Sequence, residues 1–515
     1  MVALAPWKSI IVDEPSETTQ RPDSVETEES RVPSGRIDTG DAPLSRRSWL
    51  RRLINRLEVD RAVFFVIALR LWQVLAGPLS MILIAQFFTL TSQGYYYTFA
   101  NLMALQAFCE LGLHSVIFNL SSHEWATLSL NADGCISGET SALARLAGLQ
   151  RFVAKWYRGV SALFVLGVGA AGIVLFSRSD QGVNWLGPWV ALVALSGIVL
   201  WTWAMTTLLE GCHQVVAVGR MRLIQGVMGS LCVWLSFVLG WELWSAVVAV
   251  GVRLVGDVWL LAATYRKFFV SLQTATGTSD ISWREEILPL QWRMGLRGIF
   301  GYFAFGLFTP IMFEYHGPIE AGRMGMTWTA LSALEQVAFA WIGTRAASFG
   351  SLVAKRDYRE LDRVFFRVLG ISFALLVVGG VILCGAIASL RWDGIPLGNK
   401  IADRLLNWDV TALFCVGVAG THVLRSLGTY LLAHKKDPLL LVALVSCSLM
   451  GGIVWLVGRD GGAMHMALAF AAVLCGFNLP LSWWVWRRCR REWHATASVT
   501  DTQGRATDVA SRLGE

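Results

Sequence analysis

Charged residues are scarce in this 515-residue chain. Lysine, arginine, aspartate and glutamate make up 16% of it, hydrophobic residues make up 54%, and the mean hydropathy is +0.51. About a quarter of the residues are charged in a typical soluble domain. The deficit therefore indicates a membrane protein. A bilayer-spanning helix needs about 20 mainly apolar residues, and the chain contains many such runs.

Several chemical signatures are also missing. The nine cysteines form no CxxC pair and no Cys/His cluster, so we expect neither a disulfide framework nor a metal site. A GxxxxGK[ST] phosphate loop is absent, which argues against an ATP-driven pump. Residues 1–48 are polar and acidic and lack an apolar stretch of signal-peptide length, which predicts a disordered cytoplasmic tail. We expect no cofactor.

The apolar runs predict an all-α polytopic membrane protein, because lipid offers no hydrogen-bond partners to non-helical backbone. About twelve transmembrane helices are expected. Their ranges are 63–90, 95–118, 158–177, 187–209, 221–240, 242–264, 295–316, 319–342, 368–389, 408–433, 438–457 and 463–486.

Basic residues alternate between the loops. They precede span 1, follow span 12 and fill every second loop between, whereas the other loops hold few. The positive-inside rule makes the basic loops cytoplasmic. Both termini are then cytoplasmic, and the net charge of +7 reflects membrane topology rather than nucleic-acid binding.

The spans divide into two halves of six helices near residues 265–292. The expected parts are an N-terminal lobe, 61–264, a cytoplasmic linker, 265–292, a C-terminal lobe, 293–487, and a cytoplasmic tail, 488–515. A weak internal echo supports two halves, because a glycine opens spans 2 and 8 (Gly94 and Gly322) and each span then carries an acid (Glu110 and Glu335). Repeated halves are common in secondary transporters, where the substrate site lies between them.

Charged residues inside the spans are the candidate functional residues, since a charge at the bilayer centre costs about 2.5–3.5 kcal/mol. The segment FCELGLHSVIFN, 108–119, holds Glu110 and His114 four residues apart, as if on one helix face. Glu335 is the only charge in 324–344. The others are Arg253 and Asp257 in span 6, His422 and Arg425 in span 10, and Arg70 and Arg297 near the starts of spans 1 and 7.

A rise of about 1.5 Å per residue places most of these charges in the cytoplasmic half, which suggests a polar cavity open to the cytoplasm. Simpler explanations stay open. Arg70 and Arg297 could snorkel to the interface. Arg253 and Asp257 could form a structural pair one turn apart, and His422 could serve packing alone.

Three segments resemble polysaccharide flippases of the Wzx type. GYYYTFANLMALQAFCELGLHSVIFN, 94–119, is similar to their second helix, with its Gly-x-Tyr start and acid-Leu-Gly-Leu ending. The basic loop after their eighth helix is resembled by residues 345–367, RAASFGSLVAKRDYRELDRVFFR. Their loop between helices four and five is resembled by residues 208–226, LLEGCHQVVAVGRMRLIQG. The similarity extends diffusely over 61–487. Glu110 replaces the usual Asp, and no clear proline follows Arg345.

The resemblance implies the multidrug/oligosaccharidyl-lipid/polysaccharide exporter fold, in which two six-helix lobes surround a central cavity. It also implies a substrate, an undecaprenyl-pyrophosphate-linked oligosaccharide moved to the periplasmic leaflet of the bacterial inner membrane for O-antigen, lipopolysaccharide or exopolysaccharide biosynthesis. The implied partners are this lipid-linked oligosaccharide, membrane lipids, and a polysaccharide polymerase and other assembly proteins. Nucleic acid is not among them, and the protein would not be an enzyme.

The residue roles rest on placement alone, because no arginine pattern of that family transfers by position. Guanidinium groups bind pyrophosphate oxygens through paired N–H donors. The expected substrate-binding residues are Arg70, Arg253, Arg297 and Arg425. The expected ion-coupling residues are Glu110, Glu335, Asp257 and His114, because a buried acid can carry a proton.

Two other functions remain open. A drug or toxin exporter of the same fold would prefer an acidic cavity for cations. A membrane glycosyltransferase or polysaccharide polymerase would need sizeable outer loops with catalytic groups, whereas the longest outer loop, near 390–407, has only Asp393 and Asp403.

Overall fold

The computed structural model describes residues 61–110, 112–179, 182–275, 295–296, 299–303, 305–390 and 396–494. The expected N-terminal tail, most of the expected linker, the C-terminal residues from 495 on, and Arg297 lie outside these ranges.

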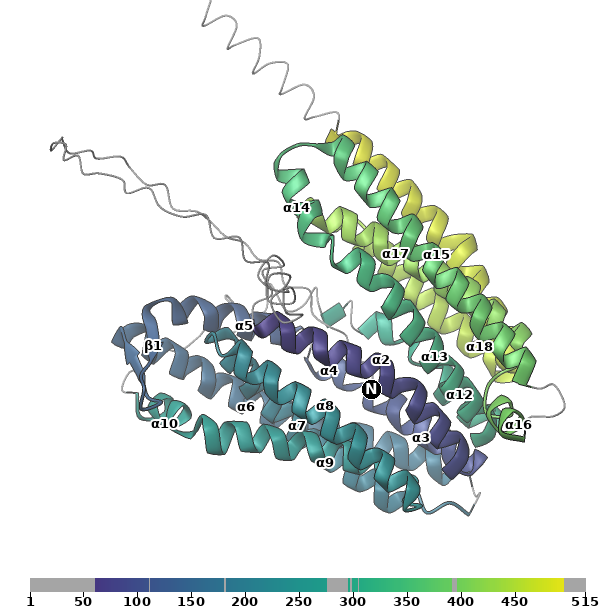
Figure 1. The fold of residues 1–515 in the computed structure, drawn as a ribbon, viewed down its shortest axis with the longest axis horizontal. Coiled ribbons are helices and arrows are strands. Elements are labelled where there is room, and N and C mark those ends of the chain that lie inside the picture. The colour runs from purple at the N-terminus through teal and green to yellow at the C-terminus, as the bar shows by residue number, and fades with distance from the viewer. Residues whose placement is uncertain are drawn as a thin grey trace, which may run out of the picture.

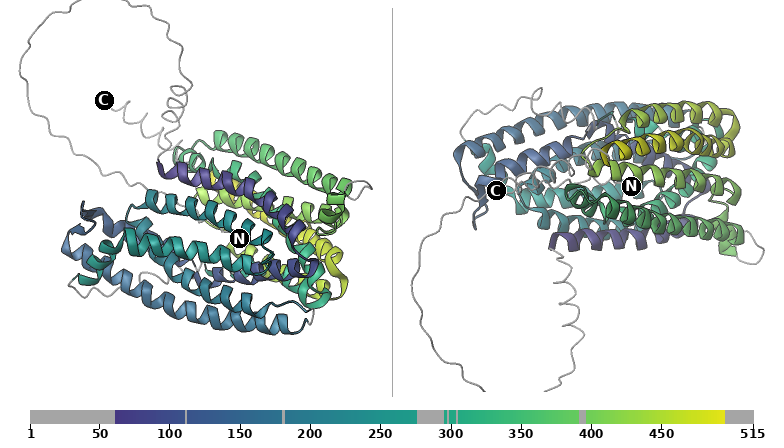
Figure 2. Two further views of the ribbon diagram at one scale, coloured as in Figure 1. Left: turned by 60° about the horizontal axis from the view of Figure 1, so that its bottom comes forward. Right: turned by 90° about the horizontal axis from the view of Figure 1, so that it is seen from above.

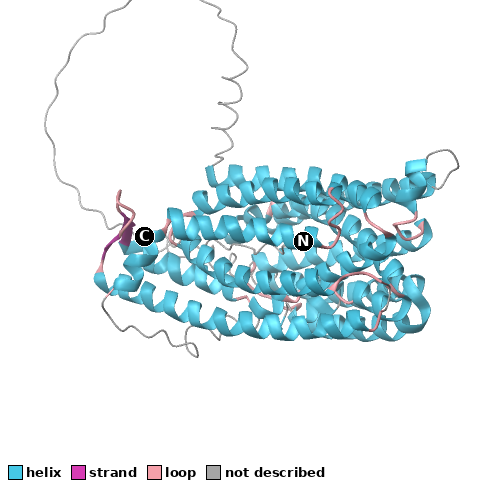
Figure 3. Cartoon of the chain, turned by 90° about the horizontal axis from the view of Figure 1, so that it is seen from below, coloured by secondary structure: helices cyan, strands magenta, loops and turns pink. Residues whose placement is uncertain are grey.

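The described chain is almost entirely helical, with one small antiparallel hairpin at one end of the molecule (Figure 3). The first elements are α2 (Arg61–Phe87), α3 (Leu90–Met103), α4 (Gln106–Glu110), α5 (Leu113–Glu124), η1 (Trp125–Thr127), β1 (Leu128–Leu130), β2 (Ile136–Gly138), α6 (Thr140–Ser177), α7 (Leu186–Gly211), α8 (Val215–Val238), α9 (Trp244–Trp259), η2 (Leu260–Thr264) and α10 (Arg266–Thr274). The later elements are α12 (Phe308–His316), α13 (Pro318–Gly343), α14 (Ala346–Ala354), α15 (Tyr358–Leu390), α16 (Pro396–Ala402), α17 (Trp408–Ala433), α18 (Leu440–Ala472) and η4 (Val473–Asn478).

The helices gather in two groups, α2–α10 and α12–η4 (Figure 1). The groups meet where α3, α12 and α16 lie, which we name the convergent end, and spread apart toward α5, α10 and α14, the divergent end. Figure 2 shows the same two groups from two other directions. Helices α6, α8 and α15 begin at the divergent end, so the described basic loops of the sequence lie there.

The described residues contain nine helices that are long and apolar enough to cross a membrane. A bent helix pair within Leu90–Thr127 would make a tenth span. The multi-pass helical architecture is therefore as expected. The exact number of twelve is not established, because the expected span 295–316 is interrupted by residues that are not described (297, 298 and 304), and its longest described helix, α12, has 9 residues.

The last candidate, Leu440–His494, has 55 residues and is too long for one span. Its backbone breaks at Gly462, where φ is 66° and ψ is −165°, in the left-handed region that glycine tolerates. A Cβ added to Gly458 would lie 2.8 Å from Met466, so the chain turns back on itself there. This break matches the gap between the expected spans 438–457 and 463–486.

The expected span 95–118 is not one continuous helix. Its two helical parts are bent by 48°, and Gly112, with φ of 74°, precedes α5. Glu110 ends α4 and His114 lies in α5, on opposite sides of this break. The two residues therefore do not share one continuous helix face, although their spacing of four suggested it.

Helices α3 and α13 pack closely near the convergent end. A Cβ added to Gly94 would lie 1.9 Å from the backbone oxygen of Pro318, and one added to Gly322 would lie 3.0 Å from the backbone nitrogen of Gly94. Only glycine allows two backbones to approach this closely. Gly94 and Gly322, which occupy matching positions in the two halves of the sequence, are thus in contact with each other across the two helix groups.

Polar contacts join the groups at the same end. Arg404 is only 8% exposed and donates from Nη1 to Gln93 Oε1 at 2.9 Å and from Nη2 to the carbonyl of Phe88. Gln93 donates in turn to the carbonyls of Gly322, at 3.0 Å, and Arg404, at 3.2 Å. An ion pair between Arg178 and Glu314 adds a second link between the groups.

The divergent end of the first group carries a small cap outside the apolar spans. Phe268 of α10 is fully buried, and its ring lies 5.8 Å from that of Trp125. The backbone nitrogen of Ile136 donates to Ser271 Oγ at 3.4 Å. The expected linker 265–292 therefore begins with a helix that packs on the first group.

Candidate functional site

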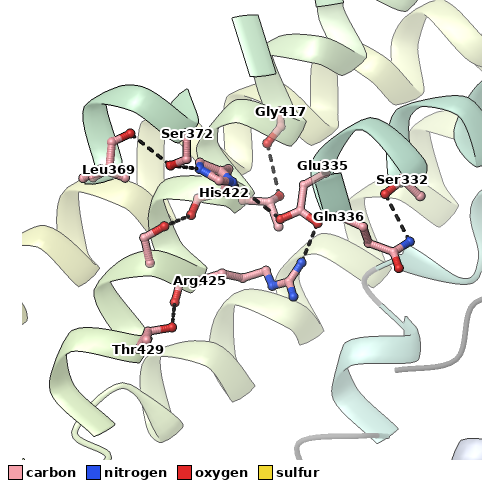
Figure 4. Close-up of polar contacts among 11 residues, drawn as sticks. Ser332, Glu335, Gln336, Leu369, Ser372, Gly417, His422, Arg425 and Thr429 are labelled. Atoms are coloured by element: carbon pink, nitrogen blue, oxygen red, sulfur yellow. Dashed lines mark hydrogen bonds and ion pairs between the residues drawn. The ribbon is translucent and has the colours of Figure 1, made fainter. Parts of the chain in front are cut away.

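One cluster of buried polar side chains lies inside the second helix group. Glu335 of α13 is 7% exposed, and its Oε2 lies 2.5 Å from Nη1 of Arg425 on α17 (Figure 4). Its Oε1 lies 3.7 Å from Nδ1 of His422, which is fully buried. Ser372 of α15 completes the cluster, with Oγ 2.9 Å from His422 Nε2. Three helices thus place an acid, a guanidinium, an imidazole and a hydroxyl together.

Helical spacing explains how these side chains meet. His422 and Arg425 are three residues apart and therefore share one face of α17. Phe339 lies one turn after Glu335 on α13, and the Arg425 guanidinium carbon is 3.9 Å from the centre of its ring. The arginine is thus held by a carboxylate and by an aromatic face. Its side chain is still 40% exposed, so a ligand can reach it.

A second cluster lies in the first helix group. Asp257 of α9 is 5% exposed and accepts hydrogen bonds from Thr202 Oγ1 at 3.0 Å and Gln225 Nε2 at 2.8 Å. Arg253, one turn before it, lies with its guanidinium carbon 5.5 Å from the centre of the Trp203 ring. Asp257 is therefore hydrogen-bonded to α7 and α8 and also lies near Arg253. The two residues are thus more than a local pair within α9.

Glu110 and His114 border this second cluster. Glu110 lies close enough to Arg253 for the two charges to interact. His114 places Nδ1 2.7 Å from Thr207 Oγ1, and its ring centre lies 5.6 Å from that of Trp203. The break at Gly112 separates the two residues along the helix, but tertiary packing brings both near the same arginine and tryptophan.

The other expected residues lie elsewhere. Arg70 is exposed and donates from Nη1 to Gln73 Oε1 at 3.2 Å, three residues along the same helix. The structure brings it into neither cluster, and Arg297 falls outside the described residues. Four of the eight predicted residues, namely Arg253, Asp257, Glu110 and His114, gather in the first group, and two, Glu335 and Arg425, in the second.

Sequence reasoning missed several polar residues. His422 was left open as a packing residue, although its position three residues before Arg425 already placed both on one helix face. The sequence does not single out Ser372, Thr202 or Gln225 as site residues, because single uncharged polar residues are common in membrane helices. Glu210, 8% exposed and 2.9 Å from Arg222 in an ion pair, was also missed.

The chemistry available is that of partly exposed arginines held near acids and aromatic rings. An arginine in such a setting can exchange its carboxylate partner for the oxygens of an anionic ligand. An acid that loses its arginine partner in a site away from water must then be neutralised, most simply by a proton. Among the described residues, no group of three or more His, Cys, Asp and Glu side chains could hold a metal ion.

Comparison with known proteins shows likeness in structure only. No protein-family model matches the chain, and no curated protein sequence matches it. A solved structure of the lipid II flippase MurJ in an inward closed conformation has a TM-score of 0.51, with 12% identity over 82% of this chain and 87% of that one. An inward-facing multidrug resistance MATE family transporter of the MOP superfamily scores 0.48, with 12% identity over 82% and 99% of the two chains. At this identity the flippase structure shows a shared fold alone, that of an all-helical polytopic membrane protein.

Proposed function

We propose that this protein is a flippase that moves an undecaprenyl-pyrophosphate-linked oligosaccharide from the cytoplasmic to the periplasmic leaflet by alternating access. The protein would lie in the bacterial inner membrane, with both termini in the cytoplasm. An ion gradient or the membrane potential supplies the driving force, and the product serves surface polysaccharide biosynthesis.

The observation that carries the proposal is the placement of Arg253 and Arg425. Each lies inside a membrane-spanning helix, beside an aromatic face and near an acid. A pyrophosphate is a multiply charged anion, and two guanidinium groups offer it planar, paired donors. Arg253 belongs to the first helix group and Arg425 to the second, so each group offers the anion one guanidinium.

The fold adds support of a coarser kind. The flippase MurJ, whose structure resembles this chain, is named for a lipid-linked substrate, lipid II. We carry that substrate class, a lipid-linked saccharide, to this protein as part of the proposal. The resemblance of residues 94–119 and 345–367 to Wzx-type flippases narrows it to oligosaccharides of surface polysaccharides.

The test is complementation of a strain that lacks the gene. The deletion strain should accumulate lipid-linked repeat units on the inner leaflet. Arg253→Lys and Arg425→Lys should insert at normal levels but fail to restore export, because lysine keeps the charge and loses the planar fork. Arg488→Lys, at an exposed arginine that pairs with Glu492 at 2.8 Å, is the matched control. Full complementation by the Lys and Ala variants of both Arg253 and Arg425 would reject the anion site.

A second candidate is a cation-coupled drug or toxin exporter. The buried acids Asp257 and Glu335 favour it, because an acid facing a cavity attracts organic cations. In that case Asp257→Asn and Glu335→Gln would remove resistance to cationic compounds, and the arginine variants would not affect it. A membrane polymerase or glycosyltransferase is the least favoured alternative.

A further inference from the structure

A groove of about 510 Å³ lies between the two helix groups near the convergent end. Its wall on the first group is one face of α6, and its wall on the second group is made by α12 and α18. The apolar part is lined by Ala171, Val174 and Leu175 of α6 and by Pro310 and Ile311 of α12. The volume falls within the range of ligand pockets, about 300–1,000 Å³.

The groove opens away from the helices that lie between its walls. Val174 is 53% exposed, whereas Phe176, two positions on and therefore on another face of α6, is buried. The Phe176 ring packs against Phe313 of α12 and Tyr95 of α3, with ring centres 5.3 Å and 5.5 Å away. These rings close the seam between α6 and α12 on the side of α3. The groove therefore faces the bilayer, and the medium that fills it is lipid.

One end of the groove lies where lipid headgroups are expected. Arg178 directly follows the last residue of α6, Glu314 lies in the last turn of α12, and the two form an ion pair. Tyr315 and Trp455, which also line the groove, are 41% and 43% exposed, and such rings are enriched at membrane–water interfaces. Ala171 lies seven residues before Arg178, so the apolar part extends about 10 Å along the helix from the ion pair.

The charges at this end are balanced and accessible. The side chain of Arg178 is 65% exposed and that of Glu314 is 21% exposed, so a ligand can reach both. Arg459 approaches from α18, with its guanidinium carbon 6.0 Å from the centre of the Tyr315 ring and Asp460 3.7 Å away. The two arginines are thus matched by two acids. This balance favours a headgroup that carries both a phosphate and an ammonium over one that is only negative.

We propose that this groove is a binding site for an aminophospholipid such as phosphatidylethanolamine. The phosphate accepts hydrogen bonds from Arg178, whose guanidinium has five N–H donors, and the ammonium donates to Glu314. An acyl chain lies against the apolar walls. The lipid contacts both helix groups at once, because α6 belongs to the first and α12 to the second.

A lipid that bridges the groups stabilises the arrangement in which the convergent end is closed, because a ligand favours the state that it binds better. In a protein that works by alternating access, this lipid would oppose opening of the convergent end. That consequence alone rests on the proposed function.

Binding can be measured by native mass spectrometry of the purified full-length protein titrated with phosphatidylethanolamine in detergent. Arg178→Gln should weaken binding of the first lipid by at least about tenfold, because a charge-assisted hydrogen bond to the phosphate is lost. Ala171→Trp should also weaken it, since the larger side chain fills the groove and leaves the ion pair in place. Arg488→Gln, which removes an exposed arginine paired with Glu492 at 2.8 Å elsewhere, should bind as wild type does.

The headgroup is tested with three lipids that have the same acyl chains. Wild type should prefer phosphatidylethanolamine over phosphatidylglycerol, which has no ammonium, and over phosphatidylcholine, whose quaternary ammonium has no N–H to donate. Glu314→Gln should remove this preference and still bind phosphatidylglycerol. Equal binding of the three lipids by wild type, a preference for either of the other two, or unchanged binding in Arg178→Gln or Ala171→Trp would overturn the site.

The bridge between the groups is tested by thermal unfolding. Added phosphatidylethanolamine should raise the unfolding temperature of wild type and of Arg488→Gln, and should raise that of Ala171→Trp much less. Lipid binding that leaves the unfolding temperature of wild type unchanged would contradict the bridge. None of these measurements uses a transported substrate, so failure of the arginine variants to behave as a flippase requires would leave the lipid site in place.

Discussion

Replacing Arg404 by methionine should loosen the convergent end of the molecule. The guanidinium is 8% exposed and donates to the Gln93 side chain and to the carbonyl of Phe88. Hydrogen bonds to charged groups contribute about 1.5–3 kcal/mol each. Losing two of them therefore costs at least about 3 kcal/mol, and methionine supplies apolar bulk but no donor. Each 1.4 kcal/mol is a factor of about ten, so local opening should rise by more than about 100-fold.

Hydrogen exchange measured by mass spectrometry can detect this change, because amide exchange follows local opening. The amide of Leu406 donates to Thr327 Oγ1 at 2.9 Å and is a natural reporter. Peptides covering residues 88–94 and 403–407 should exchange faster in Arg404→Met. Arg459→Met, at an exposed arginine 3.7 Å from Asp460, should change little, since surface ion pairs contribute about 0–1 kcal/mol. Equal exchange in wild type and Arg404→Met would refute the reasoning.

Three further predictions follow from the structure. Gly94→Ala should lower the free energy of unfolding by about 1–3 kcal/mol, because the added Cβ meets backbone atoms. Gly428→Ala should not lower it, because the atom added there meets nothing within 4 Å. Thermal unfolding in detergent compares the two variants. Burial lowers the pKa of His434 from its usual 6.5, and a hydrogen bond to the Tyr430 carbonyl opposes this in part. The folded state therefore disfavours the charged ring and loses stability as pH falls below 6.5. His434→Gln should reduce that loss between about pH 7 and about pH 5, and an unchanged pH profile would contradict it. Reporter fusions at Gly182 and Ser351 should report outside and inside respectively, and the same side for both would contradict the topology.

Several spans were predictable to within a few residues. The apolar runs 187–209, 242–264 and 408–433 correspond to Leu186–Gly211, Trp244–Thr264 and Trp408–Ala433. Lipid requires long apolar helices, so composition alone reveals them. The bend at Gly112 was not predictable, since a single glycine in an apolar run is also compatible with a straight, closely packed helix.

The candidate site was predictable in part. Counting about 1.5 Å per residue from Pro318 and from Trp408 puts Glu335 and Arg425 each about 26 Å along its helix, at matching depth. Which face of α13 meets which face of α17 depends on packing between helices 90 residues apart, and no local pattern encodes that. The contact between His422 Nε2 and Ser372 Oγ depends on a third helix, α15.

The broken helix that contains Glu110 has a consequence for solvent. Ala104 lies between α3 and α4, about 21 Å from the start of α3 at Leu90, and is therefore within the hydrocarbon layer of about 30 Å. Irregular backbone at that depth is tolerated only where protein covers it or water reaches it. Ala104 is exposed, and Leu105 and Glu110 are only half-buried, so protein does not cover the bend completely. The chain meets this requirement itself at two amides, because those of Ala104 and Leu105 donate to the carbonyls of Ala100, at 3.2 Å, and Leu102, at 3.1 Å. The helix can therefore bend at this depth while these two groups need no partner from the solvent.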